Sequence, residues 1–353
     1  MIDPRVLIDC CRDERQAKMR AKQLENHFFT HHIKDPEKMS DLGNLAPRLV
    51  ELAFPQVLKT LKTQVGDAGT TIKKLYRLAD GKAVETVLML YSDRATLCIS
   101  CQVGCAMGCP FCATGKLGLG RNLTTREMLE EVFEAAKYLD ELDVDNMENG
   151  RRLTNIVFMG EGEPTQNLPN IFEALKQICA GEPNSKTPTF GLSGRNITIS
   201  TVGISKGIKA MTQDPRPFRL ALSLHTPFDE QRNELVPMNK HTSVAELLDL
   251  CLEYFNTKNR RVSIEYALMR GINDTTHHAK TLAKLLNQRG TGWAHVNLIP
   301  LNEVEGSKWT ASTPEVTRAF IETLTSKSIP TTLRISRGQD IDGACGQLAL
   351  TEN

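Results

Sequence analysis

The sequence predicts an α/β protein: an open, partial barrel of six β/α units, (β/α)6, preceded by a small N-terminal helical domain and a β-hairpin extension. Two observations predict the barrel. From Leu97 onward, strand-like and helix-like stretches alternate along the chain, which is typical of parallel strands joined by helices. Six or seven of these stretches are strand-like, and a closed barrel needs eight. A third observation, the different pattern before Leu97, separates the N-terminal elements from the barrel.

Residues 1–75 are expected to form the helical domain. Amphipathic spacing predicts helices at Arg15–Phe28, Leu45–Leu52 and Phe54–Leu61, with a turn at Asp35–Pro36. These elements are short and would need to pack against the rest of the protein.

Residues 76–95 are expected to form the hairpin extension. Within Lys73–Leu90, β-branched and aromatic residues flank an Asp80–Gly81 turn, which is typical of two antiparallel strands. Residues 96–353 would then form the barrel, with the glycine-flanked Cys345 near its end.

The barrel elements are assigned from hydrophobic period and length. Strands are expected at Leu97–Ser100, Leu153–Met159, Asn196–Thr201, Phe218–Leu224, Val262–Met269, Ala294–Pro300 and Thr331–Ile335. Helices between them are expected at Thr125–Leu139, Leu168–Ala180, Ser205–Met211, Val244–Phe255, Thr275–Gln288 and Pro314–Ser326. The Pro/Gly/Ser-rich segment Gly181–Gly194 is expected to be a surface loop.

Composition is typical of a globular protein. The chain has 353 residues, 40% hydrophobic and 24% charged, and no run of eighteen apolar residues, so no membrane span is expected. The N-terminus has no secretory signal pattern, and we expect a cytoplasmic protein. In that reducing compartment, ten cysteines indicate metal ligands, nucleophiles or core packing rather than a disulfide framework.

The net charge of +1 neither requires nor excludes a nucleic-acid partner, because local patches matter more. Basic residues gather in three groups: Arg12, Arg15, Lys18, Arg20 and Lys22; Lys59, Lys62, Lys73, Lys74 and Arg77; Lys258, Arg260 and Arg261. On charge alone, each group is equally well explained as a solvated surface.

Three closely spaced cysteines, Cys105, Cys109 and Cys112, indicate a metal centre. Thiolates are soft ligands that select zinc or iron–sulfur. A structural zinc site needs four ligands, and the next histidine after Cys112 is the distant His225. Three thiolates instead suit a [4Fe–4S] cluster with one open iron, which a small molecule can bind through its own nitrogen and oxygen.

Polar residues follow the ends of several predicted strands, where β/α barrels place their reactive groups. Singly, each is better explained as a turn, a helix cap or a packing residue. Together they would face one cavity, with hydroxyl, imidazole, amide and carboxylate groups suited to a ribose, an adenine or an amino acid. The residues expected to bind a cofactor that contains such groups are Gly162, Glu163, Ser200, Ser223, Leu224, His225 and Asn297.

Eight short segments carry a family signature. They are Arg20–Leu24, Thr96–Ser100, Gln102–Cys105, Phe111–Gly115, Gly162–Pro164, Ser223–His225, Asn297–Pro300 and Asp340–Leu348. Together they resemble the RlmN/Cfr family of radical S-adenosylmethionine (SAM) RNA adenine methyltransferases, and most closely its RlmN branch. The resemblance covers nearly the whole chain. It implies a radical SAM barrel, SAM, a [4Fe–4S] cluster on the three cysteines, and an RNA-binding N-terminal domain.

The resemblance also implies a catalytic course. Cys345 would accept a methyl group from one SAM molecule. A second SAM, bound at the cluster, would be cleaved to a 5′-deoxyadenosyl radical that takes hydrogen from the methylated Cys345. The carbon radical would add to adenine, and Cys98 would help release the product by forming a disulfide with Cys345. Glu85 matches the family's proton acceptor, and two SAM molecules would be consumed per methyl group.

The implied substrates are an adenosine in the peptidyl-transferase centre of 23S rRNA and the adenosine 3′ of the anticodon in some tRNAs. The implied electron donor is a flavodoxin or ferredoxin. Adenine C2 is not nucleophilic, so radical addition avoids the electron pair that an ordinary methyl transfer requires. A Cfr-like enzyme that methylates C8 is the alternative within the family. Pro164, Val103 and the Ser336–Gly338 segment resemble RlmN instead.

Three positions depart from the family pattern. One is Gly343, which stands where the family commonly has alanine and would loosen the Cys345 loop. Cys101 creates a second spacing with Cys105, so an alternative cluster ligand or an oxidised pair is conceivable. Glu161 stands where the family usually has methionine, and would place an additional carboxylate beside the SAM site. Outside the enzyme class, an RNA-binding or ribosome-assembly protein with a structural metal would explain the cluster, but it leaves Cys98 and Cys345 without roles.

Overall fold

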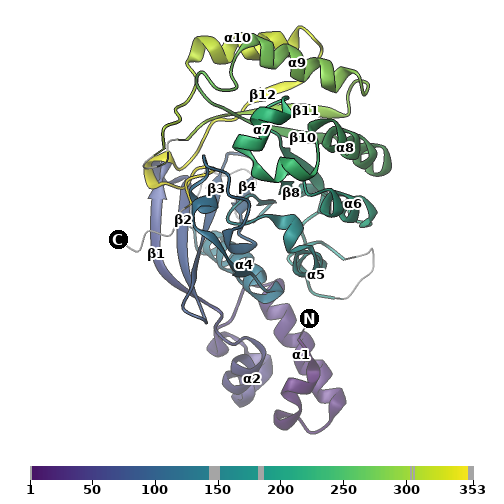
Figure 1. Cartoon of the computed structure of the whole chain (residues 1–353). Helices are drawn as coiled ribbons and strands as arrows, with labels where there is room; N and C mark the ends of the chain where they lie inside the picture. Colours follow the sequence, from purple (N-terminus) through teal and green to yellow (C-terminus); the bar gives the residue numbers. More distant parts are fainter. Residues whose placement is uncertain (1, 143–151, 182–186, 303, 305–306, 349–353) are drawn as a thin grey trace.

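The computed structural model describes residues 2–142, 152–181, 187–302, 304 and 307–348. At its centre is a ten-stranded sheet in the order β1-β2-β3-β4-β7-β8-β9-β10-β11-β12 (Figure 1). Seven of these strands are parallel: β4 (Ala95–Cys98), β7 (Asn155–Phe158), β8 (Ile197–Thr201), β9 (Arg219–Ser223), β10 (Val262–Leu268), β11 (Ala294–Pro300) and β12 (Thr331–Leu333). In the described part of the chain β12 pairs only with β11, so the sheet is open and the predicted partial barrel is confirmed.

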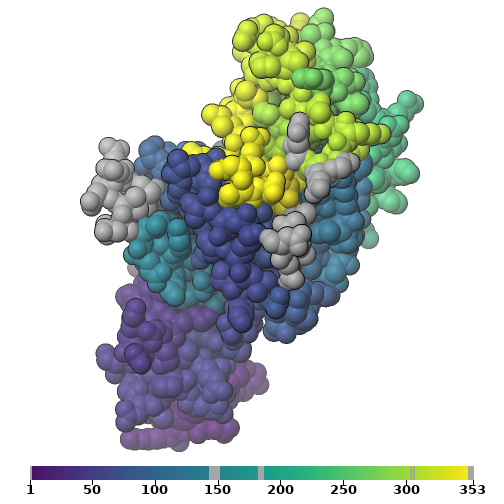
Figure 2. Space-filling view, turned by 90° about the vertical axis from the view of Figure 1, so that its left-hand side faces the viewer, coloured from purple at the N-terminus to yellow at the C-terminus, as the bar shows by residue number. Residues whose placement is uncertain are grey.

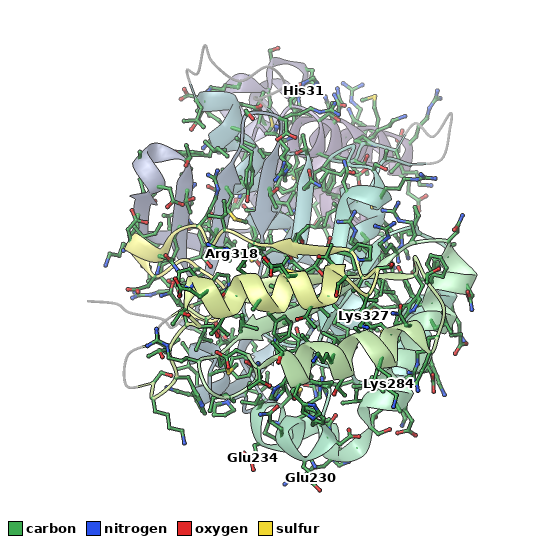
Figure 3. All side chains as sticks on the ribbon, turned by 90° about the horizontal axis from the view of Figure 1, so that it is seen from above. His31, Glu230, Glu234, Lys284, Arg318 and Lys327 are labelled. Atoms are coloured by element: carbon green, nitrogen blue, oxygen red, sulfur yellow. The ribbon has the colours of Figure 1, made fainter. Side chains whose placement is uncertain are left out.

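Helices connect the parallel strands and line the outer side of the sheet in Figure 1. They are α4 (Thr125–Glu141), α5 (Leu168–Ile178), α6 (Ser205–Gln213), α7 (Asp229–Leu235), α8 (Val244–Lys258), α9 (Thr276–Asn287) and α10 (Pro314–Thr325). Figure 3 shows charged side chains of α7, α9 and α10, among them Glu230, Lys284 and Arg318, on the outer surface. The apolar faces of these helices therefore cover the sheet, and every residue of β10 is buried. All predicted barrel strands and helices are present; α7 was not predicted.

The N-terminal strands extend the sheet in antiparallel fashion. β2 (Thr71–Leu78) and β3 (Ala83–Leu90) form the predicted hairpin around Gly81, which has a φ of +84°. The predicted helix Phe54–Leu61 is wrong: β1 (Leu58–Gly66) is a strand paired with β2. Pro55 lacks the amide hydrogen that a continuing helix needs, and β-branched residues follow it. The helical part thus ends at Ala53, while the division into domains remains a prediction.

The N-terminal helices pack against α4. α1 (Glu14–Phe29) and α2 (Ala46–Ala53) are joined by short 3-10 turns. The Phe28 ring stacks on Phe133 of α4 at 4.4 Å and on Phe54 at 4.8 Å, and the Arg126 guanidinium lies 4.5 Å from its centroid. Figure 2 shows this N-terminal unit, in purple, at one end of the molecule. Aromatic packing therefore attaches it to the barrel.

A small second sheet carries the cysteine cluster. β5 (Gln102–Cys105) pairs with β6 (Gly118–Asn122), and α3 (Ala113–Lys116) lies between them. Gly104 has a φ of +68°, and a Cβ there would lie 2.0 Å from the carbonyl oxygen of Gly118, so only glycine fits. Part of the predicted surface loop, residues 182–186, lies outside the described residues. Among the described helices, none has the length and apolar character of a membrane span.

Candidate active site

A cavity opens at the carboxyl ends of the parallel strands. It contains about 1040 Å³ of space, including its open mouth. Nine residues predicted for the site line it: Cys105, Cys109, Cys112, Gly162, Glu163, Ser200, Ser223, His225 and Cys345. Their positions at the carboxyl ends of parallel strands therefore bring together residues that are far apart in sequence.

The three cluster cysteines lie on the loop from β5 to α3. Cys109 is buried and the other two are half-buried. Gly115 packs so closely that a Cβ would lie 2.9 Å from the carbonyl oxygen of Cys109. Burial raises the pKa of all three thiols, so a bound cation would be needed to hold them as thiolates at neutral pH.

No group of three or more His, Cys, Asp or Glu side chains in the described residues is placed to hold a single metal ion. A [4Fe–4S] cube is bound through separate irons, so its cysteines need to face one cavity rather than one point. Three thiols lining one wall, beside a cavity with further polar groups, fit such a cluster.

Glu163 is held at the cavity wall by backbone hydrogen bonds. Its carboxylate accepts hydrogen bonds from the Val202 amide at 2.9 Å and from the Thr165 amide at 3.1 Å. Burial raises its pKa. Gly162 has a φ of +101°, and a Cβ there would lie 2.5 Å from the Gln102 side chain. Glycine at this position therefore lets the chain turn tightly into the cavity.

His225 is a buried, neutral imidazole. Its Nδ1 accepts the Ala267 amide hydrogen at 3.0 Å, so its own proton is on Nε2. Burial, and then the charge of Arg232, lower its pKa to about 3. The Phe111 ring, which precedes Cys112, lies edge-on at 5.0 Å. His225 can thus donate one hydrogen bond to a ligand at any ordinary pH.

Besides Cys98, three predicted residues do not line the cavity. Leu224 is fully buried and donates its amide to the carbonyl oxygen of Glu265. Asn297 donates to Glu265 Oε2 at 2.7 Å, and Glu265 itself lines the cavity. Glu85 is buried and paired with Lys73 at 3.0 Å. The roles of these three residues remain predictions.

Hydrogen bonds join the C-terminal loop, residues 338–348, to the cluster loop. The Ala113 amide donates to the Gly346 carbonyl, and the Thr114 hydroxyl donates to the Leu348 carbonyl, both at 2.8 Å. The Asn302 side chain donates to the carbonyl of Cys345 at 2.9 Å. Cys345 is therefore held beside the cluster cysteines by backbone contacts.

A second pocket lies behind Cys345 and is lined by both Cys98 and Cys345. Burial, and then the charge of Cys345, raise the pKa of Cys98 to about 12. The Cys345 charge also raises the pKa of Arg334, which lines both pockets. A guanidinium next to two thiols favours whichever one is ionised.

Sequence reasoning missed Glu265, Asn302 and Arg334, which line the first cavity. Glu265 lies in the fifth predicted strand and Arg334 in the seventh, the two strands to which no site residue had been assigned. Arg334 directly follows β12 and Asn302 lies two residues after β11, so a search for polar residues at the carboxyl end of every strand would have found both. Glu265 lies in the middle of β10 and has no such signal.

Two of the departures from the family pattern, Cys101 and Glu161, lie away from the cavity lining. The Cys101 thiol is buried and donates to the Glu161 carbonyl at 3.5 Å. The Glu161 carboxylate is fully buried and accepts hydrogen bonds from the amides of Glu85 at 2.9 Å and Gly104 at 3.3 Å. Glu161 thus connects β3 to β5 instead of presenting a carboxylate to the cavity.

Comparisons with known proteins agree with this geometry. The model of the radical SAM superfamily matches residues 99–283. A protein from Bifidobacterium adolescentis named probable dual-specificity RNA methyltransferase RlmN is 53% identical over 95% of this chain and 86% of its own length. One of the same name from a Nocardioides species is 47% identical over 99% of this chain and 94% of its own. The crystal structure of a radical SAM methyltransferase from Sphaerobacter thermophilus is 38% identical, with a TM-score of 0.87 over 98% of this chain and 96% of that chain.

Proposed function

Because the chain belongs to the RlmN family of radical SAM RNA methyltransferases, we propose that it methylates adenine C2 in RNA. The proposed targets are an adenosine in the peptidyl-transferase centre of 23S rRNA and the adenosine 3′ of the anticodon in some tRNAs. Such substrates would make the activity cytoplasmic. The proposed electron donor is a flavodoxin or ferredoxin.

The cavity supports binding of the two cofactors that radical SAM enzymes use. Cys105, Cys109 and Cys112 would hold a [4Fe–4S] cluster, which together with SAM supplies one-electron cleavage of SAM when both are bound. Gly162, Glu163, Ser200, Ser223 and His225 line the space beside the cysteines and would bind SAM, with Leu224 and Asn297 as further predicted contributors.

One observation carries the proposal: Cys345 lines both pockets. On the side of the first cavity it faces the SAM site, where it would receive a methyl group and later lose a hydrogen atom from it. Cys345 shares the second pocket with Cys98, whose thiolate would attack the Cys345 sulfur. Cys345 is the one thiol common to the two lining sets among the described residues.

Product release would leave a disulfide. Attack of the Cys98 thiolate on the Cys345 sulfur would form the S–S bond and break the bond from that sulfur to the transferred carbon. The carbon would leave with the electron pair of the broken bond and take up a proton, which completes the methyl group. Two external thiols or one dithiol would then reduce the disulfide before the next cycle. The Arg334 guanidinium beside both sulfurs would favour the thiolate that attacks.

Glu85 is the proposed proton acceptor, and its side chain is ion-paired with Lys73. Lys73 also donates to the carbonyl of Asp342, three residues before Cys345. A shift of the C-terminal loop would therefore alter the surroundings of Glu85. This coupling supports a proton acceptor that responds to the position of Cys345.

The test uses protein reconstituted anaerobically with iron and sulfide. Reductant, methyl-labelled SAM and unmodified 23S rRNA fragments or tRNA are added, and the nucleosides are analysed by mass spectrometry. Labelled 2-methyladenosine that disappears with Cys345→Ala would support the proposal. Label at C8 would move the chain to the Cfr-like alternative. An intact cluster without any methylation would refute the proposed substrates.

A further inference from the structure

The rim of the second pocket carries the most exposed large apolar side chain described. Ile335 is 83% exposed, and Val65 follows at 54%. Single exposed apolar residues are common and need no explanation. Ile335 differs because it also lines the pocket that contains Cys98 and Cys345.

Strand geometry explains why Ile335 faces outward. β12 ends at Leu333, and the Arg334 amide still donates to the Leu298 carbonyl of β11 at 2.8 Å. Successive side chains of an extended segment point to opposite sides. Arg334 therefore points toward the thiols, while Leu333 and Ile335 are on the opposite, exposed side of the segment, and Ile335 borders the pocket.

The ring of Tyr91 lines the same pocket, and two guanidinium groups lie on that ring. The Tyr91 ring has the Arg94 guanidinium at 4.0 Å and the Arg337 guanidinium at 4.2 Å from its centroid. Tyr91 and Arg337 both line the pocket together with Ile335. Cation–π contacts orient flat guanidinium groups along the ring.

The two arginines are held differently. Nη1 of Arg337 donates to the Thr70 hydroxyl and to the Leu90 carbonyl, each at 3.0 Å, so this guanidinium is fixed. Arg94 is exposed and paired only with the exposed Asp93 within the described part of the chain. Figure 2 shows the C-terminal segment, in yellow, at the surface against the N-terminal strands, in blue. The rim thus carries two cations, with the Asp93 carboxylate beside Arg94 and the Asp67 carboxylate bound to the Gly338 amide next to Arg337.

We propose that this rim binds the RNA substrate, with Ile335 packing against the base next to the target adenosine while Arg94 and Arg337 bind its flanking phosphates. The inference rests on the proposed function. A target base that reaches Cys345 must leave its stack, and an apolar side chain that takes its place offsets part of the lost stacking. Arginines supply the phosphate contacts.

The experiment measures binding without SAM, so that it is independent of methyl transfer. Full-length reconstituted protein is titrated into a labelled RNA hairpin that carries 2-aminopurine, whose fluorescence rises on unstacking, in place of the target adenosine. Affinity and fluorescence are recorded over a series of salt concentrations. Ile335→Ala should weaken binding about tenfold with an unchanged salt slope, and should reduce the fluorescence rise.

Arg94→Gln should behave differently, because a phosphate contact releases counterions. Its salt slope should fall by about one, with the fluorescence rise retained on the RNA that remains bound. Leu333→Ala is the matched control, since Leu333 is 45% exposed on the same side of the chain but does not line the pocket. It should bind RNA as the wild type does.

Wild-type affinity and fluorescence in Ile335→Ala would overturn the inference. Equal losses in Leu333→Ala and Ile335→Ala would also overturn it, because the contact would then belong to the strand edge. So would dissociation of a dimer by Ile335→Ala in size-exclusion chromatography, which would assign the side chain to a second copy of the chain. If the wild type binds and unstacks the RNA but forms no 2-methyladenosine, the proposed function fails while this inference stands.

Discussion

Replacement of Lys73 by methionine should destabilise the protein by about 3 to 5 kcal/mol, the usual cost of removing one partner of a buried ion pair. Lys73 Nζ lies 3.0 Å from Glu85 Oε1, and the two side chains are only 3% and 2% exposed. Methionine keeps most of the side-chain volume but leaves the Glu85 carboxylate without its cation. Glu85 Oε2 already has no partner among the described residues, so nothing nearby replaces the lost charge.

The assay is a double-mutant cycle in guanidinium chloride. The unfolding free energy is measured for the wild type, Lys73→Met, Glu85→Leu and the double variant. The double variant should be more stable than either single variant, because it buries no unpaired charge. Lys59→Met on the exposed side of β1 is the control and should change stability by less than about 0.5 kcal/mol.

The reasoning is refuted if Lys73→Met costs less than about 1 kcal/mol, or if the double variant is no more stable than Lys73→Met. Either result would mean that water or another group solvates Glu85 in the folded protein. Because Lys73 also donates to the Asp342 carbonyl, the C-terminal loop should become more susceptible to proteolysis in Lys73→Met.

Three further predictions follow from buried groups. Burial raises the pKa of Glu161 to about 8 from an ordinary 4.5, so the folded state binds the proton of this side chain more tightly than the unfolded state does. The protein should therefore lose stability as the pH rises from about 4.5 to 8, by at most ~5 kcal/mol. The melting temperature of Glu161→Gln should depend less on pH than that of the wild type, and parallel curves for the two proteins would contradict this. Cys101→Ser should retain the iron, sulfide and visible absorbance of the reconstituted cluster, because the Cys101 thiol contacts the Glu161 carbonyl and does not line the cavity. Loss of the absorbance would show that Cys101 is a cluster ligand. Arg232 is fully buried and donates to the carbonyls of Val202 and Ser223, both on the cavity wall. Arg232→Met should therefore lower the free energy of unfolding, measured in denaturant, by at least ~3 kcal/mol, and should weaken SAM binding measured by calorimetry. Unchanged SAM affinity would show that the cavity wall does not depend on Arg232.

The parallel strands could be predicted because each is a short apolar run followed by an amphipathic helix. β10, with all seven residues buried, is the clearest case. The same reasoning failed at Phe54–Leu61, where apolar residues with no clear period fit either element. There the decisive facts were Pro55 and the partner strand β2, and the second is a tertiary contact that local sequence does not contain.

Site residues could be predicted where they lie at the carboxyl ends of parallel strands, because these ends meet at one edge of the sheet. Ser200, Ser223 and His225 face the cavity for that reason. Contacts between distant loops could not be predicted. The rim formed by Tyr91 with Arg337 and the hydrogen bond from Asn302 to Cys345 depend on how segments far apart in the chain meet.

The contacts of the C-terminal loop also explain how Cys345 can line both pockets. The C-terminal loop is attached to α3 through the Ala113 amide, to the segment after β11 through Asn302, and to the N-terminal strands through Lys73. Each attachment accepts through a backbone carbonyl of the loop, so none constrains the side chain of Cys345. Two side chains of the loop are also held, because Asp340 accepts the Asp67 amide and Gln339 donates to the Asn302 side chain. Neither contact involves the side chain of Cys345. Rotation about its χ1 would therefore turn the sulfur from the first cavity toward the second pocket without breaking any of these contacts.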